Sequence, residues 1–188
     1  MQTIIFEKAG RENTVRTLEA AFQACQELKI DQMVVASTYG DTALKAAEMI
    51  QGCDIKLVVV THNAGFKEPG TIEMSSETRQ KIEEMGAKVC TATMPFRNIG
   101  TAIRQRQGYS QQDLIANTLR ILGQGIKVCV EIAMMASDSG LILPADTVTV
   151  AGTGRGADTA ALIRPVPSNM LFDMKVRWII AKPMDWPG

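Results

Sequence analysis

Short runs rich in Val and Ile alternate with helical patterns along the chain, and this alternation constrains the fold more than any other feature. The runs are largely apolar throughout, which is typical of strands buried on both faces of a parallel sheet. The helical patterns between them suit the crossover connections that parallel strands require. We therefore predict an α/β protein of three layers, α/β/α, with a mainly parallel sheet.

Five segments fit buried strands best, and they are residues 32–37, 55–61, 87–93, 146–152 and 176–182. A sixth candidate strand, residues 159–166, is bounded by Pro165. Helices are expected within residues 12–30, 41–49, 75–86, 110–125 and 126–140, from apolar residues at helical spacing and from Ser, Thr and Asn residues suited to cap them. No linker divides the chain, so residues 1–188 are expected to form a single domain.

Two further stretches, residues 62–74 and 94–109, are predicted to be irregular. Each follows a strand, so both should lie at the edge of the sheet where the parallel strands end, here called the carboxyl edge. Ligands of open α/β sheets bind at this edge because successive loops and helix N-termini meet there.

Composition excludes several classes of partner. Lys and Arg together number 20, as do Asp and Glu, so no net charge favours nucleic acid or an anionic membrane. The four cysteines are far apart and lack the spacing of a zinc site, so no metal is expected. No stretch reaches the ~20 apolar residues that span a bilayer, and the N-terminus lacks the basic start of a signal peptide. We expect a cytoplasmic protein.

The first candidate site is the turn Ser37-Thr38-Tyr39-Gly40-Asp41-Thr42, between a strand and an alanine-rich helix. Its hydroxyls and the free N–H groups of a helix N-terminus are the parts of a phosphate cradle, although Asp41 or Thr42 would equally serve as an ordinary helix cap. Gly40 allows a ligand to approach the backbone closely. We expect Gly40→Val to block a phosphate while leaving the fold intact.

The second candidate site is the glycine loop within residues 151–162, where Thr153, Gly154, Arg155 and Gly156 follow a strand. It lacks the lysine of a P-loop and the spacing of the Rossmann fingerprint, so nucleotide hydrolysis gains no support. One guanidinium in a flexible loop suits a phosphate or carboxylate, with Thr159 also in reach. A tight turn with a solvated arginine is the alternative.

A third group, Thr61, His62 and Asn63, ends the strand at residues 55–61. His62 is the only histidine, and it is placed to act as a general base or to contact a ligand, or simply to cap a turn with Asn63. Glu68 and Glu73 follow in the same stretch without the spacing of a catalytic pair. No nucleophile with its base can be assembled from the sequence.

Taken in order, these segments resemble the C-terminal α/β domain of pyruvate kinase in a free-standing form. The resemblance is carried by "LEAAFQACQELKIDQMVVASTYGDTALKAAEM", by "KLVVVTHN" and by "ADTVTVAGTGRGADTAALIRPVP". It covers residues 13–61 and 125–167 with some specificity, and the middle of the chain only by element order.

The resemblance implies a phosphate at Ser37, Thr38, Gly40 and Thr42, because some kinases hold a phosphorylated effector in this turn, with the loop at residues 153–156 across the same crevice. Asp41 departs from the family pattern and would repel a bisphosphate. Small free-standing proteins of this kind resemble binders of flavin mononucleotide (FMN), which is therefore the expected cofactor. The kinase barrel is missing, so no pyruvate kinase activity is expected.

The sequence thus favours binding of a phosphorylated small molecule. One alternative is an enzyme acting on a phosphorylated metabolite, or a flavin-dependent reductase, using His62 and the two irregular stretches as a roof. A further alternative is a regulatory module with a vestigial pocket. The apolar end of the chain, with Trp178 and Trp186, suggests that a homo-oligomer covers it.

Overall fold

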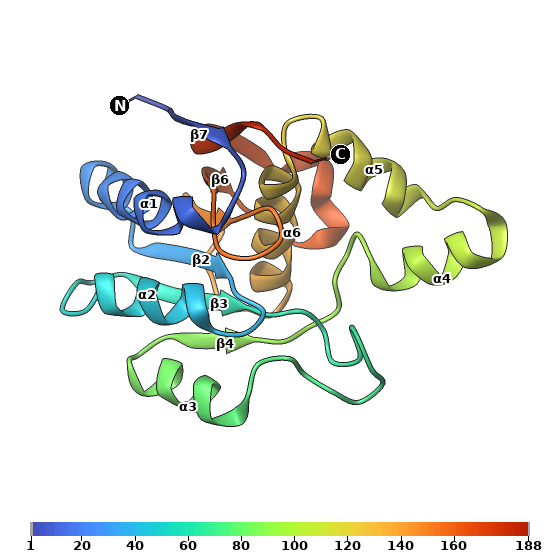
Figure 1. Ribbon diagram of the computed structural model, residues 1–188, viewed down its shortest axis with the longest axis horizontal. Coiled ribbons are helices and arrows are strands. Elements are labelled where there is room, and N and C mark those ends of the chain that lie inside the picture. The colour runs from blue at the N-terminus through green and yellow to red at the C-terminus, as the bar shows by residue number, and fades with distance from the viewer. Residues whose placement is uncertain (1, 188) are drawn as a thin grey trace.

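The computed structural model describes residues 2–187 of the chain. Within these residues the strands form one seven-stranded sheet in the order β1-β7-β6-β5-β2-β3-β4 (Figure 1). The strands are β1 (Ile4–Lys8), β2 (Gln32–Ala36), β3 (Lys56–Val60), β4 (Lys88–Cys90), β5 (Thr147–Ala151), β6 (Thr159–Arg164) and β7 (Lys175–Asp185). Neighbouring strands are parallel except around β6, which is antiparallel to both β5 and β7. The mainly parallel sheet is confirmed.

Helices cover both faces of the sheet, which gives the three predicted layers (Figure 1). One face carries α1 (Thr14–Leu28), α2 (Asp41–Met49) and α3 (Ser76–Glu84), and the other carries α6 (Gln124–Asp138). The helix α5 (Gln111–Arg120) packs on α6 and continues from α4 (Asn98–Gln107), so that α4 and α5 project from the sheet as an arm. Two 3-10 turns complete the chain, at Arg11–Asn13 and Ser168–Asp173.

Two consecutive residues of β2 explain why its sequence is apolar throughout. Val34 packs with Met135 of α6, whereas Val35 packs with the cluster that contains Leu18 and Ala43 on the opposite face. Successive side chains of a strand point to opposite faces, and here both faces are covered by helices.

The sequence missed two elements. The strand β1 pairs only with β7 at the edge of the sheet, and only Phe6 of its five residues is buried. The stretch 94–109, predicted to be irregular, contains α4, of which only Gly100 is buried. Both lack the apolar periodicity of a core element because they lie at the margin of the fold. The stretch 62–74 is irregular as predicted.

The mostly parallel order brings five connections to one edge. Residues 9–13 follow β1, residues 37–40 follow β2, residues 61–75 follow β3, residues 91–97 follow β4, and residues 152–158 join β5 to β6. These connections frame the carboxyl edge. Among residues 2–187, no helix has both the length and the apolar character to cross a bilayer.

Candidate functional site

A crevice at the carboxyl edge consists of two adjoining pockets. The smaller, of about 250 Å³, lies between the turn at residues 37–42 and the glycine loop. The larger, of about 640 Å³, extends from the end of β3 between α6 and the arm of α4 and α5. Ser37, Thr38 and His62 line both pockets. The two loops singled out in the sequence therefore face each other, and the crevice continues beyond them.

The turn before α2 leaves its backbone donors free. Ser37 Oγ accepts a hydrogen bond from the N–H of Ala43 at 3.2 Å, and so caps the helix. The N–H groups of residues 39–42 donate no hydrogen bond to any atom of residues 2–187. Thr42 also lines the smaller pocket, so these donors lie at the positive end of the α2 dipole, an arrangement suited to an anion.

Gly40 serves the turn and does not line the pocket. Its φ of 101° lies in the left-handed region, and a Cβ there would meet Thr78 Cγ2 of α3 at 2.2 Å. Gly40→Val would therefore strain the backbone and push α2 away from α3. The expectation that this substitution leaves the fold intact is wrong, because Gly40 packs against a neighbouring helix.

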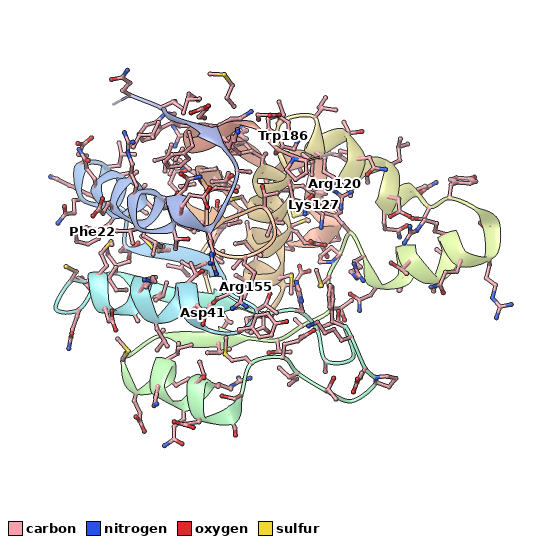
Figure 2. The ribbon with its side chains drawn as sticks, viewed as in Figure 1. Phe22, Asp41, Arg120, Lys127, Arg155 and Trp186 are labelled. Atoms are coloured by element: carbon pink, nitrogen blue, oxygen red, sulfur yellow. The ribbon has the colours of Figure 1, made fainter. Side chains whose placement is uncertain are left out.

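Arg155 of the glycine loop reaches across the smaller pocket to the turn (Figure 2). Its guanidinium pairs with Asp41 Oδ2 at 2.5 Å and lies 4.9 Å from the centre of the Tyr39 ring. Lys67 contacts the same tyrosine, donating to its hydroxyl at 2.6 Å. The charge of Asp41, which was expected to repel a bisphosphate, is thus balanced locally by Arg155.

A hydrogen bond within the glycine loop fixes its conformation. The N–H of Thr153 donates to Asp158 Oδ2 at 3.0 Å, while the buried Thr153 hydroxyl has no hydrogen-bond partner among residues 2–187. Gly154 and Gly156 line the smaller pocket. Thr159 does not, since it is buried against Gly125 and donates to Asp158. The expectation that Thr159 lies in reach of the ligand is wrong, because it is the first residue of β6 and points into the core.

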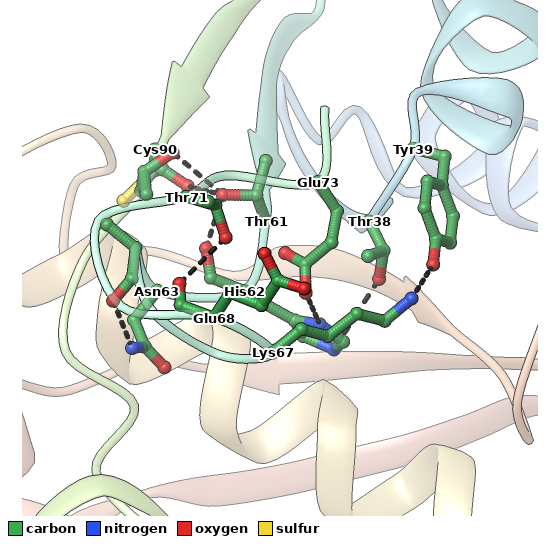
Figure 3. A network of polar contacts seen from close by, with 12 residues as sticks. Thr38, Tyr39, Thr61, His62, Asn63, Lys67, Glu68, Thr71, Glu73 and Cys90 are labelled. Carbon is green, nitrogen blue, oxygen red and sulfur yellow. Dashed lines mark hydrogen bonds and ion pairs between the residues drawn. The ribbon is translucent and has the colours of Figure 1, made fainter. Parts of the chain in front are cut away.

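His62 connects several of the predicted residues (Figure 3). Its Nε2 lies 3.5 Å from Thr38 Oγ1, and its Nδ1 lies 3.9 Å from Glu73 Oε1. The imidazole stacks on Phe66 with 3.7 Å between ring centres, and the guanidinium of Arg97 covers the same phenyl ring at 4.0 Å. Burial lowers the pKa of His62, and Arg97 acts in the same direction, whereas Glu73 and Glu131 oppose the shift.

Thr61 and Asn63, on either side of His62 in the sequence, make hydrogen bonds within the protein. Thr61 is buried, and its hydroxyl lies 2.7 Å from that of Thr91, the residue that follows β4, so it ties the end of β3 to the end of β4. Asn63 donates to the carbonyl of Ala64 at 2.6 Å and does not line the crevice. Thr61 lines the larger pocket.

The floor of the larger pocket is a buried ion pair on α6. Lys127 and Glu131 are one helical turn apart and in direct contact, and Glu131 Oε1 also accepts the N–H of Phe96 at 2.9 Å. The Lys127 ammonium lies 5.6 Å from the Phe96 ring centre. Burial lowers the pKa of Lys127, and the Glu131 carboxylate opposes that shift.

The wall of the larger pocket carries an excess of positive charge. Among its lining residues, four are Lys or Arg and two are Asp or Glu. Arg104 pairs with Asp113 at 3.1 Å, whereas Arg97 and Arg120 have no carboxylate within 4.0 Å among residues 2–187. Two arginines without a counter-charge favour an anionic ligand.

Comparison with known proteins places this architecture in a family. Residues 16–164 match the profile described as "Pyruvate kinase, alpha/beta domain". The chain belongs to this family. The pyruvate kinase α/β domain is thus confirmed as the relative inferred from the turn at residues 37–42 and the glycine loop, and the match also spans the middle of the chain.

Solved structures similar to this chain include two of a pyruvate kinase from Cryptosporidium parvum. One matches at 12% identity with a TM-score of 0.43, over 81% of this chain and 23% of the kinase. The other, a complex with ADP, matches at 12% identity with a TM-score of 0.44, over 81% of this chain and 24% of the kinase. An O-ureido-L-serine synthase matches at 11% identity with a TM-score of 0.34, over 67% of this chain and 48% of the synthase. The chain spans about a quarter of the kinases' length.

Several residues that line the larger pocket were not predicted from the sequence. Arg97 and Arg120 gave no signal because they stand in segments read as a loop and as an ordinary amphipathic helix. Lys127 and Glu131 could have been recognised from the sequence, because two opposite charges four residues apart inside an apolar helix indicate a buried ion pair. Glu73 was noted and set aside, because its approach to His62 depends on how residues 62–74 fold back.

Proposed function

We propose that this protein binds a phosphorylated small molecule in the crevice at the carboxyl edge. The phosphate lies against the free N–H groups of residues 39–42 and against Arg155, and the remainder of the ligand occupies the larger pocket. The observation that carries the proposal is the continuity of the two pockets, with unsatisfied donors at one end and arginines without a counter-charge at the other. An anion gains charge-assisted hydrogen bonds at either end.

FMN is the best candidate for this ligand. The larger pocket has the volume of a typical small-molecule site, and its lining includes the aromatic side chains His62, Phe66 and Phe96, which suit an apolar ring system. A single phosphate matches the one Arg155 of the smaller pocket, and Asp41 beside it disfavours a bisphosphate.

Calorimetric titration with FMN, riboflavin and inorganic phosphate tests the proposal. We expect FMN to bind more tightly than riboflavin, and Thr42→Ala to weaken FMN binding by about tenfold, which corresponds to about 1.4 kcal/mol. Thr118→Ala, on the exposed face of α5, is the matched control and leaves the affinity unchanged. Equal binding of FMN and riboflavin, or no binding of either with no bound ester in the purified protein, would contradict the proposal and favour a vestigial pocket.

An enzyme acting on the phosphorylated ligand, including a flavin-dependent reductase, is the second candidate function. It is favoured by the approach of His62 to a buried carboxylate on one side and a hydroxyl on the other, which are the contacts of a general base. Incubation with phosphate esters followed by mass spectrometry of the products tests it. Turnover that persists in His62→Gln would exclude His62 as the base.

We further propose that the protein is a homo-oligomer. The two tryptophans are not the best support for this, since Trp178 is half-buried and donates to Thr3 Oγ1 at 3.1 Å. The exposed side chains of Phe172, at 91%, and Met184, at 71%, are stronger support. Light scattering at tens of micromolar protein should give more than the mass of one chain, and a monomer would contradict the proposal.

A further inference from the structure

His62 lies where the two pockets meet, and its two ring nitrogens face different surroundings. Nδ1 is turned inward toward Glu73, whose side chain is only 7% exposed. Nε2 is turned toward Thr38, which lines the smaller pocket. Figure 3 shows the imidazole lying between these two partners. The ring therefore links a buried carboxylate to the proposed phosphate site.

The buried side of the ring determines where its proton resides. Nδ1 of His62 and Oε1 of Glu73 are both buried, lie 3.9 Å apart, and have no hydrogen-bond partner among residues 2–187. A carboxylate only accepts hydrogen bonds, so the proton of a neutral imidazole belongs on Nδ1, pointing at Glu73. Nε2 then carries a lone pair and accepts from the Thr38 hydroxyl.

This arrangement suits the free protein but not one that holds a phosphate. Phosphate oxygens accept hydrogen bonds, and a lone pair on Nε2 would face them without a proton between. The charged groups around the ring are Glu73 from the loop, Arg97 from the start of α4 and Glu131 from α6. Burial and Arg97 lower the pKa of the imidazole, while the two carboxylates oppose that shift and so reduce the cost of protonating the ring.

We propose that His62 takes up a proton from solvent when a dianionic phosphate binds beside Thr38, so that the site binds the anion and the proton together. This proposal rests on the proposed function. In the complex Nδ1–H donates to Glu73 and Nε2–H donates to the phosphate, so both ring nitrogens and the buried carboxylate are satisfied. A ligand without the phosphate binds without the proton.

The chain offers a clean measurement, because His62 is its only histidine. One imidazole signal in the NMR spectrum therefore reports its titration without assignment. We expect the pKa of His62 to lie below its usual value in the free protein and to rise when the protein is saturated with FMN or with inorganic phosphate. Riboflavin, the matched ligand without phosphate, should leave this pKa low.

The coupling between phosphate binding and protonation of His62 should also make the affinity for FMN depend on pH. Above about pH 7 the phosphate of FMN is already a dianion, because its second pKa is about 6. Between the free and bound pKa values of His62, the affinity for FMN should fall by up to about tenfold per pH unit, since one proton is bound with the ligand. His62→Gln should remove this slope while FMN still binds. Calorimetry in buffers of different ionisation enthalpy should give uptake of about one proton by the wild type.

The substitution Glu73→Gln tests whether the Glu73 carboxylate stabilises protonated His62 or only supports the loop. It removes the charge that stabilises the imidazolium, so the bound-state pKa of His62 and the proton uptake should both decrease. Glu68→Gln is the matched control, because this exposed carboxylate lies in the same loop but does not face the ring. It should change neither quantity.

The outcomes distinguish this proposal from the one on which it rests. If neither FMN nor inorganic phosphate binds, both proposals fail. If either binds while the pKa of His62 stays unchanged, or if riboflavin raises it equally, the phosphate site stands and the proton coupling is wrong.

Discussion

Two ion pairs of the crevice contrast in their burial, although each joins one carboxylate to one cation. The side chains of Arg155 and Asp41 are 63% and 67% exposed and come from segments 114 residues apart. The side chains of Lys127 and Glu131 are 6% and 2% exposed and stand one turn apart on α6. Figure 2 shows Asp41 and Arg155 beside one another, and Lys127 on the central helix α6.

Because the two ion pairs differ in exposure, they should differ in how easily they can be broken. An exposed pair contributes about 0 to 1 kcal/mol, so a phosphate that competes for Arg155 meets little resistance. A buried pair is costly to break, because the remaining charge is left without water or partner. The outer pair is therefore suited to exchange a carboxylate for a ligand, whereas the inner pair holds Phe96 and the floor of the larger pocket in place.

The largest effect should come from breaking the inner pair. Glu131→Gln retains an acceptor for the N–H of Phe96 but leaves the Lys127 ammonium buried without a counter-charge, so the free energy of unfolding should decrease by about 3 to 5 kcal/mol. Chemical denaturation measures this. Adding Lys127→Met removes the uncompensated charge and should restore most of the loss. If Glu131→Gln alone leaves the free energy of unfolding unchanged, the buried ion pair is no more costly to break than the exposed one.

The next effect concerns ligand affinity. Arg155→Ala removes a charge-assisted bond to the phosphate, worth about 1.5 to 3 kcal/mol, and should weaken FMN binding by about tenfold or more. Because the guanidinium is exposed, the free energy of unfolding should change by less than about 1 kcal/mol. Calorimetry and denaturation of the same sample check both. Unchanged affinity would place the phosphate at the arginines of the larger pocket instead.

The smallest effect should come from Asp41→Asn. This substitution frees Arg155 and removes a negative charge beside the proposed phosphate, so FMN should bind a few times more tightly while stability changes by less than about 1 kcal/mol. Asp54→Asn, which removes an exposed carboxylate before β3 and so changes the net charge by the same amount, is the matched control. Weaker FMN binding in Asp41→Asn would mean that the carboxylate contacts the ligand directly.

The sequence predicted the elements that the core requires. The strand β2 and the helices α1 and α6 were identified because burial on one or both faces imposes an apolar pattern on them. The edge strand β1 and the projecting helix α4 were missed, since neither has to bury a continuous face.

The residues of the candidate site also fall into those that the sequence predicted and those that it did not. The turn at residues 37–42 and the glycine loop were recognised because backbone chemistry at a strand end is local in sequence. The approach of Glu73 to His62, and the position of Arg97 over Phe66, depend on how residues 62–97 fold back across the edge. Such contacts between irregular segments leave no periodic signal.

The pairing of β1 with β7 has a mechanical consequence. These strands are parallel, with Ile4 opposite Ala181 and Lys8 opposite Asp185, so the start of one and the end of the other lie at opposite ends of the ribbon. A force that pulls Ile4 and Asp185 apart loads their hydrogen bonds in shear, and the bonds must yield together instead of unzipping one at a time. The load passes through this pair alone and bypasses β2 and β3, so tension along the chain reaches the crevice only after β1 has slipped from β7.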